Sequence, residues 1–100
     1  MDINIKAIHF DISDQLTAFV NKKAERLARR FPAIANMDFN LRLVKPETAM
    51  NKEAVIVIAV PRTPDLAATK TADTFEEAID LALEALERQL EKQKEKQQAK

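Results

Sequence analysis

The longest helical pattern in the chain is DTFEEAIDLALEALERQL, residues 73–90. Its apolar residues recur every three or four positions, which is the spacing of one buried helix face. They are Phe75, Ala78, Ile79, Ala82, Leu83, Leu86 and Leu90. Thr74, followed three residues later by Glu77, forms a capping box, and we predict that the helix begins there. Because the apolar face must be covered, the fold needs a second layer.

The ten residues after Leu90, EKQKEKQQAK, are mostly helix formers but carry no apolar stripe. A length of 100 residues suits a single domain with one core. We therefore predict one domain over residues 1–90. Residues 91–100 are predicted to form a polar, lysine-rich helical extension or a frayed tail.

Upstream of this helix, two segments alternate apolar and polar residues, as half-buried strands do. They are residues 2–9, with Ile3, Ile5 and Ala7 on one side, and residues 37–43, with Met37, Phe39, Leu41 and Leu43. Between them, Ser13 fits a helix N-cap and Pro32 ends the helix that follows. The buried face predicted for this first helix consists of Leu16, Val20, Ala24, Leu27 and Phe31.

Residues 54–60 form a β-branched run without alternation, which favours a central strand or a sheet partly covered on both faces. Residues 66–72 are a weaker candidate for a fourth strand, rich in Ala and Thr. We predict an α+β fold, a two-layer β-α-β-β-β-α sandwich with a four-stranded sheet and both helices on one face. The order of the strands in the sheet stays open.

The composition excludes several classes of function. The chain has no Cys and no Gly, which excludes disulfides, thiolate metal sites, a P-loop and the glycine turn of dinucleotide sites. Left-handed turn positions must therefore fall to residues such as Asn36 or Asn51. Residues 1–10 lack the continuous apolar stretch of a signal peptide or membrane anchor. We expect a cytoplasmic protein without a membrane partner.

Few side chains in the chain offer catalytic chemistry. His9 is the only histidine and Ser13 the only serine, and we expect His9 at the surface or at a strand edge. Asp80 lies one helical turn from Glu76 and from Glu84, a spacing that glycosidases and metal sites use, but a solvated acidic flank explains it more simply. We predict no enzymatic activity, no catalytic residues, no metal, no cofactor and no small-molecule substrate.

The total charge is neutral, with 16 basic and 16 acidic residues, yet the charges are sorted along the chain. Residues 22–30 hold five bases and one acid, residues 73–87 hold six acids and no base, and residues 88–100 hold five bases and two acids. Helical spacing groups the bases into two rows. One row is Lys22, Arg26, Arg29 and Arg30, and the other is Arg88, Lys92, Lys96 and Lys100.

If the two helices pack side by side, we expect these two rows to flank one cationic groove. Such a groove attracts a phosphate backbone, because each neutralised phosphate releases counterions. Solvated helix faces explain the same charges without a partner. Phe19 falls beside Lys22 and Arg26, where it is either a stacking platform for a base or a ring covered by arginine stems.

Two groups of residues resemble the ribosome hibernation-promoting factor family, also labelled sigma-54 modulation protein. One group is DTFEEAID at residues 73–80 with LERQLEKQKEK at residues 86–96. The other is Ile3-Asn4-Ile5, followed by Asp11-Ile12-Ser13, Leu16, Phe19 and Val20. The likeness covers nearly the whole chain, although Phe75 stands where the family usually has Tyr and Thr74 where it more often has Met.

The resemblance implies a domain similar to double-stranded RNA-binding domains. Such a domain sits on the small ribosomal subunit, in the channel used by messenger and transfer RNA. Family members block translation during growth arrest and promote or prevent the pairing of ribosomes. The implied partners are the small subunit and its ribosomal RNA. By motif position, the resemblance assigns RNA contacts to basic residues of both helices, and we add Arg29 and Arg30 from the same face of the first helix. The predicted RNA-binding residues are Lys22, Lys23, Arg26, Arg29, Arg30, Arg88, Lys92, Lys94 and Lys96.

Longer members of this family carry a linker and a C-terminal dimerisation domain, which these 100 residues do not contain. We therefore expect a monomer when the protein is free. The leading hypothesis is a non-enzymatic factor for ribosome hibernation and translation regulation in the stress response. The alternative is a protein-interaction module in which the acidic face of the last helix, residues 76–87, docks a basic partner.

Overall fold

A computed structural model of the chain describes residues 1–44 and 49–98, with the side chains of residues 1–44 and 49–94. Six elements follow one another in the predicted order β-α-β-β-β-α. They are β1 (Asp2–Ile8), α1 (Asp14–Arg30), β2 (Asn36–Leu43), β3 (Lys52–Ala59), β4 (Leu66–Ala72) and α2 (Phe75–Gln98). The predicted α+β fold class is therefore confirmed.

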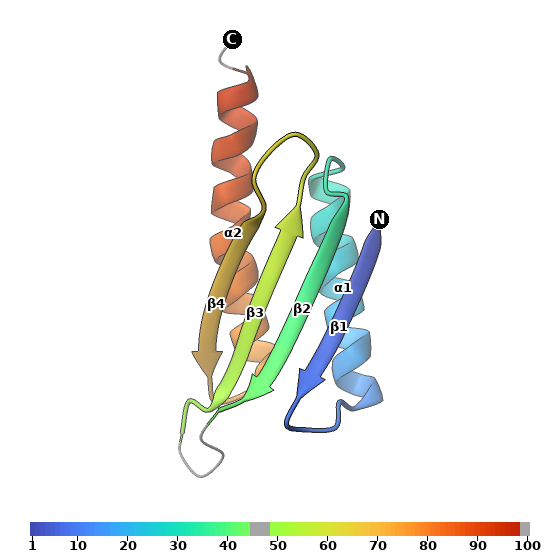
Figure 1. Cartoon of the computed structure of the whole chain (residues 1–100), viewed down its shortest axis with the longest axis vertical. Helices are drawn as coiled ribbons and strands as arrows, with labels where there is room; N and C mark the ends of the chain where they lie inside the picture. The colour runs from blue at the N-terminus through green and yellow to red at the C-terminus, as the bar shows by residue number, and fades with distance from the viewer. Residues whose placement is uncertain (45–48, 99–100) are drawn as a thin grey trace.

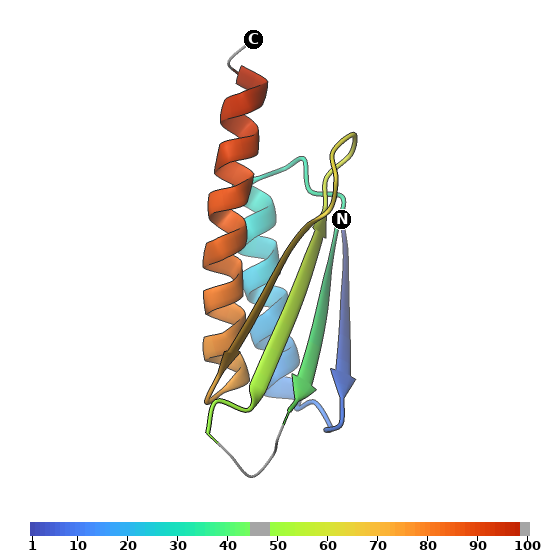
Figure 2. The same cartoon turned by 60° about the vertical axis from the view of Figure 1, so that its left-hand side comes forward.

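The four strands form one sheet in the order β1-β2-β3-β4, which the sequence had left open. β1 and β2 are parallel because α1 carries the chain back between them, while the neighbouring pairs β2–β3 and β3–β4 are antiparallel. Both helices lie side by side on one face of the sheet, as the two views show (Figures 1 and 2). No described element covers the opposite face.

The core lies between the sheet and the helices. Alternate residues of the two central strands point into it, and both helices turn their predicted apolar faces toward it. The fully buried strand residues are Met37, Phe39 and Leu41 of β2 with Ala54, Ile56 and Ile58 of β3. On the other face of β3, Val55 and Val57 are half-exposed. β3 is a central strand, which confirms the first of the two alternatives, and its outer face is only half-exposed.

Both helices begin where the capping residues predict. The Leu16 N–H donates to Ser13 Oγ at 3.1 Å, and the Glu77 N–H donates to Thr74 Oγ1 at 3.1 Å. Each bond satisfies one of the backbone donors that the first turn of a helix leaves without a partner. Ser13, the only serine of the chain, therefore has a structural role at the start of α1.

Within residues 1–44 and 49–98, three residues adopt left-handed backbone conformations: His9 at φ 69°, Met50 at φ 59° and Arg62 at φ 69°. The expectation that Asn36 or Asn51 would take such positions is wrong. Asn36 begins β2, and Asn51 is buried beside β3. Pro61 explains the position of Arg62, because Pro favours the second residue of a type II turn and the third then needs a positive φ.

Replacing Arg62 with Gly is expected to stabilise the fold by about 0.5–1 kcal/mol, because Gly has no Cβ to strain at φ 69°. The turn itself is retained, since the Thr63 N–H donates to the Val60 carbonyl at 3.3 Å. Thermal unfolding measures the effect, with an expected rise in Tm of about 4 °C. The control is Arg62→Ala, which keeps a Cβ. An equal gain in that variant would contradict the backbone explanation.

α2 is longer than the body of the domain. Among its side chains up to residue 94, the last buried one is Leu90, and the helix continues to Gln98 beyond the end of the sheet (Figure 1). This projection makes the molecule slender, with principal extents of 50 × 23 × 18 Å. Among the described helices, none has the length and apolar character that crossing a bilayer requires.

Candidate nucleic-acid interface

α1 divides its basic residues between two directions. Its core face holds Leu16, Val20, Ala24 and Leu27, so helical spacing places the bases on the remaining sides. Lys22 and Arg29 are exposed and lie outside the groove between the helices. Arg26, which is also exposed, turns toward α2 together with Lys23 and Arg30. The row that the sequence predicts on one side of α1 is therefore split.

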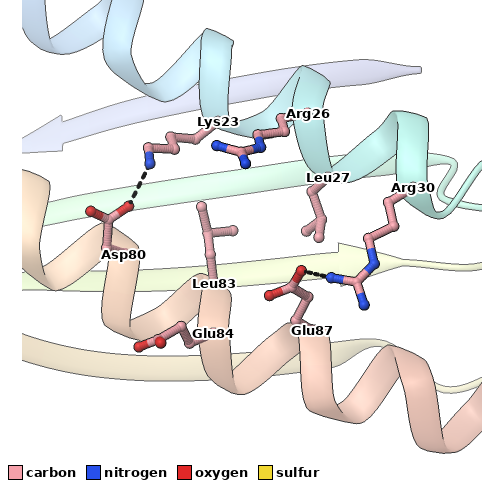
Figure 3. A pocket seen from close by; sticks show the side chains of 8 residues that line it. All are labelled: Lys23, Arg26, Leu27, Arg30, Asp80, Leu83, Glu84 and Glu87. Atoms are coloured by element: carbon pink, nitrogen blue, oxygen red, sulfur yellow. Dashed lines mark hydrogen bonds and ion pairs between the residues drawn. The ribbon is translucent and has the colours of Figure 1, made fainter.

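A groove of about 590 Å³ separates the two helices. Leu27 of α1 and Leu83 of α2 are its apolar lining residues, and the other side chains that line it are charged (Figure 3). The wall from α1 is basic and the wall from α2 is acidic. The charged lining residues are Lys23, Arg26, Arg30, Asp80, Glu84 and Glu87.

Ion pairs cross this groove at two levels. Lys23 Nζ lies 3.2 Å from Asp80 Oδ1, and the Arg30 guanidinium binds the carboxylates of both Glu87 and Glu91. These acids are spaced four, three and four residues apart with Glu84, which places them on the α1 side of α2. The expectation of one cationic groove between the two rows is therefore wrong. The wall that α2 contributes to the groove is acidic, not basic.

The bases of α2 lie elsewhere on that helix. Arg88 and Lys92 each follow a groove-facing acid by one residue, a rotation of about 100° that turns them out of the groove toward solvent. Arg88, Lys92 and Lys94 are exposed. The side chains of Lys96 and Lys100, which complete the predicted row, lie outside the described residues.

The exposed bases of both helices nevertheless gather at one end of the molecule. α1 and α2 run in the same direction, so the end of α1 lies beside the second half of α2 (Figure 1). Arg30 at this end is paired with Glu87 and Glu91, and the other exposed helix bases there, which we call the basic end, are Arg26, Arg29, Arg88, Lys92 and Lys94. Within residues 1–44 and 49–94, none of these five forms an ion pair.

The β3–β4 loop adds a base to this end that the sequence did not single out. Arg62 is exposed and lies in the loop at the end of the sheet from which α2 projects (Figures 1 and 2). Val60 of the same loop lines a pocket together with Leu90 and Lys94, which fixes the loop next to α2. The sequence alone does not indicate that this arginine lies near the bases of the helices, because its position depends on the order of the strands.

A family model described as "Sigma 54 modulation protein / S30EA ribosomal protein" matches residues 3–98. The chain belongs to this family. The match confirms the resemblance carried by the first strand and the last helix. Family membership makes it a ribosome-associated protein.

Two solved structures resemble this S30EA family member. A ribosomal subunit interface protein from Coxiella burnetii is 26% identical, with a TM-score of 0.83, over 94% of this chain and 98% of that one. The N-terminal domain of Thermus thermophilus Protein Y shares the fold, with 24% identity and a TM-score of 0.75, over 92% of this chain and 98% of that one. The comparison with curated proteins gave no match.

Phe19 of this S30EA family member is not a bare platform. The ring is half-buried against the core, and Lys23 Nζ lies 5.3 Å from its centroid. A lysine, not the expected arginine stems, therefore covers it. Phe75, where the family usually has Tyr, is buried and stacks on Phe10 with ring centroids 4.4 Å apart.

The other residues considered for chemistry have structural surroundings. His9 is exposed just after β1, and Asp80 is paired with Lys23. In the described part of the chain, no three His, Asp or Glu side chains gather closely enough to hold a metal ion. The acidic face considered as a docking surface is partly engaged within the molecule, because Asp80 and Glu87 bind α1.

The helix layer of the S30EA family member is polarised along its length. Acids occupy the first turns of both helices, with Asp14 in α1 and Glu76 and Glu77 in α2. The last turn of α1 holds Arg29 and Arg30. Each sign complements the helix macrodipole at its own end, which favours the fold as well as any anionic partner.

Proposed function

We propose that this protein binds ribosomal RNA in the decoding channel of the small subunit and excludes transfer and messenger RNA. It acts by occupying space, as a hibernation and translation-inhibition factor in the cytoplasm, and not as an enzyme. The observation that carries this proposal is the family match over residues 3–98. The likeness to a ribosomal subunit interface protein over 94% of the chain supports it.

The basic end supports this proposal with a physical reason for RNA binding. Its five exposed cations come from two parallel helices and make no ion pair with described residues. Long, unpaired Lys and Arg side chains gain affinity for phosphates by releasing condensed counterions. Lys22 and Arg62 extend the same surface. Of the proposed RNA contacts, Lys23 and Arg30 must first leave their carboxylate partners.

The slender shape supports a mechanism of steric exclusion. The molecule measures 50 × 23 × 18 Å, and α2 carries Lys92 and Lys94 at the point where it leaves the body of the domain. A rigid helix holds these bases at fixed spacing, which suits a phosphate backbone better than a flexible tail does. Occupying a channel in this way needs no catalytic group.

Cosedimentation with purified small subunits tests the proposal. We expect binding that transfer RNA and messenger RNA displace, and a slope of log affinity against log salt near −4 if about six phosphates are engaged. Binding without competition from either RNA would contradict the proposed position on the subunit. Capture of a basic protein that survives nuclease treatment and high salt would instead favour the interaction module that uses the acidic face of α2.

A further inference from the structure

The outer edge of β1 is an open strand edge. The Asp2 N–H donates to the Ala35 carbonyl at 3.2 Å, and Asp2 is in register with Asn36. In a parallel pair this places the backbone groups of Asp2, Asn4 and Lys6 toward β2. The N–H and C=O groups of Ile3, Ile5 and Ala7 consequently point outward. No described strand lies beside them.

The charged side chains of Asp2 and Lys6 are the features of β1 that commonly protect an edge strand. β1 pairs with β2 over seven consecutive residues without a bulge, and it contains no Pro. The opposite edge differs, because Gln89 Nε2 donates to the Ala67 carbonyl of β4 at 3.3 Å. α2 thus occupies part of the β4 edge, whereas β1 offers its full length.

We propose that the partner for this edge is a second copy of the chain, paired antiparallel through β1. The two-fold axis passes beside Asn4 and joins the two sheets into one continuous sheet. Ile3 then faces Ile5 of the partner subunit and exchanges backbone hydrogen bonds with it. Asp2 faces Lys6 of the partner subunit, and by symmetry the pair occurs twice.

Charge complementarity selects both the occupant and the register. Asp2 and Lys6 are exposed and lie on the same face of β1. They fall on a non-hydrogen-bonded pair, where opposed side chains come closest. A shift of register that sets Ile5 against its own copy would put Asp2 opposite Ile8 and Lys6 opposite Asn4, and both ion pairs would be lost. A strand of another protein that lacks these charges in this order would pair with β1 less favourably.

The apolar side of the strand agrees with the same pairing. Ile3 and Ile5 are only half-buried at the margin of the core. Antiparallel pairing brings the two isoleucines of one copy against those of the other and removes apolar surface from water. The contact is small, so the dimer is weak and forms at high protein concentration. It replaces the monomer expected for the free protein.

Sedimentation equilibrium on the whole chain, up to about 1 mM, tests the proposal. The wild type is expected to show a reversible dimer. Asp2→Lys and Lys6→Asp each place like charges opposite each other twice, and each should weaken dimerisation at least about fivefold. An equimolar mixture of the two variants pairs Lys with Asp at every position and should recover wild-type affinity. Monomer throughout in the wild type, or no recovery in the mixture, would overturn the proposal.

Two further variants separate pairing from folding and from net charge. Ile5→Pro removes an N–H that points away from β2, so the chain should keep its circular dichroism spectrum and lose the dimer. Lys70→Asp makes the same charge change on β4 as Lys6→Asp makes on β1. It should leave dimerisation unchanged, and an equal loss would reject the β1 edge as the interface.

Discussion

A chain carrying Arg26→Glu and Lys92→Glu is expected to bind small subunits at least about 100-fold more weakly than the wild type. Both side chains are exposed at the basic end, one on each helix, and neither has an ion-pair partner among the described residues. Each reversal removes a phosphate contact and adds repulsion in its place. The slope of log affinity against log salt should fall in magnitude by about 1.5. Cosedimentation or fluorescence anisotropy at several salt concentrations measures both quantities.

The matched control reverses two cations on the sheet, Lys6→Glu with Lys70→Glu. It changes the net charge by the same amount, and both residues are exposed on strands away from the basic end. Affinity for the small subunit should change by no more than about twofold, because surface charges beyond a Debye length are screened. If both double variants lost the same affinity, net charge and not the basic end would explain the binding.

A chain carrying Glu87→Gln and Glu91→Gln is expected to bind small subunits about tenfold more tightly than the wild type. These two carboxylates hold the Arg30 guanidinium in the groove and lie beside the cations of the basic end. Their neutralisation frees one base and removes two repulsive charges. The free energy of unfolding should fall by no more than about 1 kcal/mol, because the ion pairs are exposed. Titration of labelled protein with subunits gives the affinity.

The control for this gain is Glu76→Gln with Glu77→Gln, at the other end of α2. The change in net charge is identical, but the two acids make no contact with the basic end. We expect an affinity gain of no more than about twofold. Equal gains in affinity in the two double variants would show that the ion pairs between Arg30 and the groove acids do not limit binding.

The features that the sequence predicts well are those set by local chemistry. Ser13 and Thr74 cap the helices as predicted, because a cap depends on a side chain and a backbone donor three residues away. The alternation in β1 and β2 identifies their buried faces for the same reason. The parallel pairing of β1 with β2 is a long-range contact that no local pattern encodes.

The charge of the groove could not be predicted, because it depends on how α2 is rotated against α1. Glu87 and Arg88 are adjacent in sequence, yet one binds Arg30 and the other points outward. Helical spacing predicts the two rows of basic residues, but it does not predict which side chains of the other helix lie opposite each row. Arg62 was missed for a related reason, since only the sheet order brings its loop to the end of the helices. The left-handed positions likewise follow loop geometry and not residue preference.

The shared direction of α1 and α2 has a consequence for how the molecule approaches a polyanion. The dipoles of two antiparallel helices largely cancel, whereas those of two parallel helices add, and the side-chain charges at their ends reinforce the sum. A molecule with zero net charge and a large electric dipole moment is rotated by an electric field, but a uniform field exerts no net force on it. It turns its cationic pole toward the phosphates during diffusion, and it is drawn in only where the field varies steeply over its own length. A concave wall of folded RNA provides that gradient, and an isolated extended strand provides far less of it.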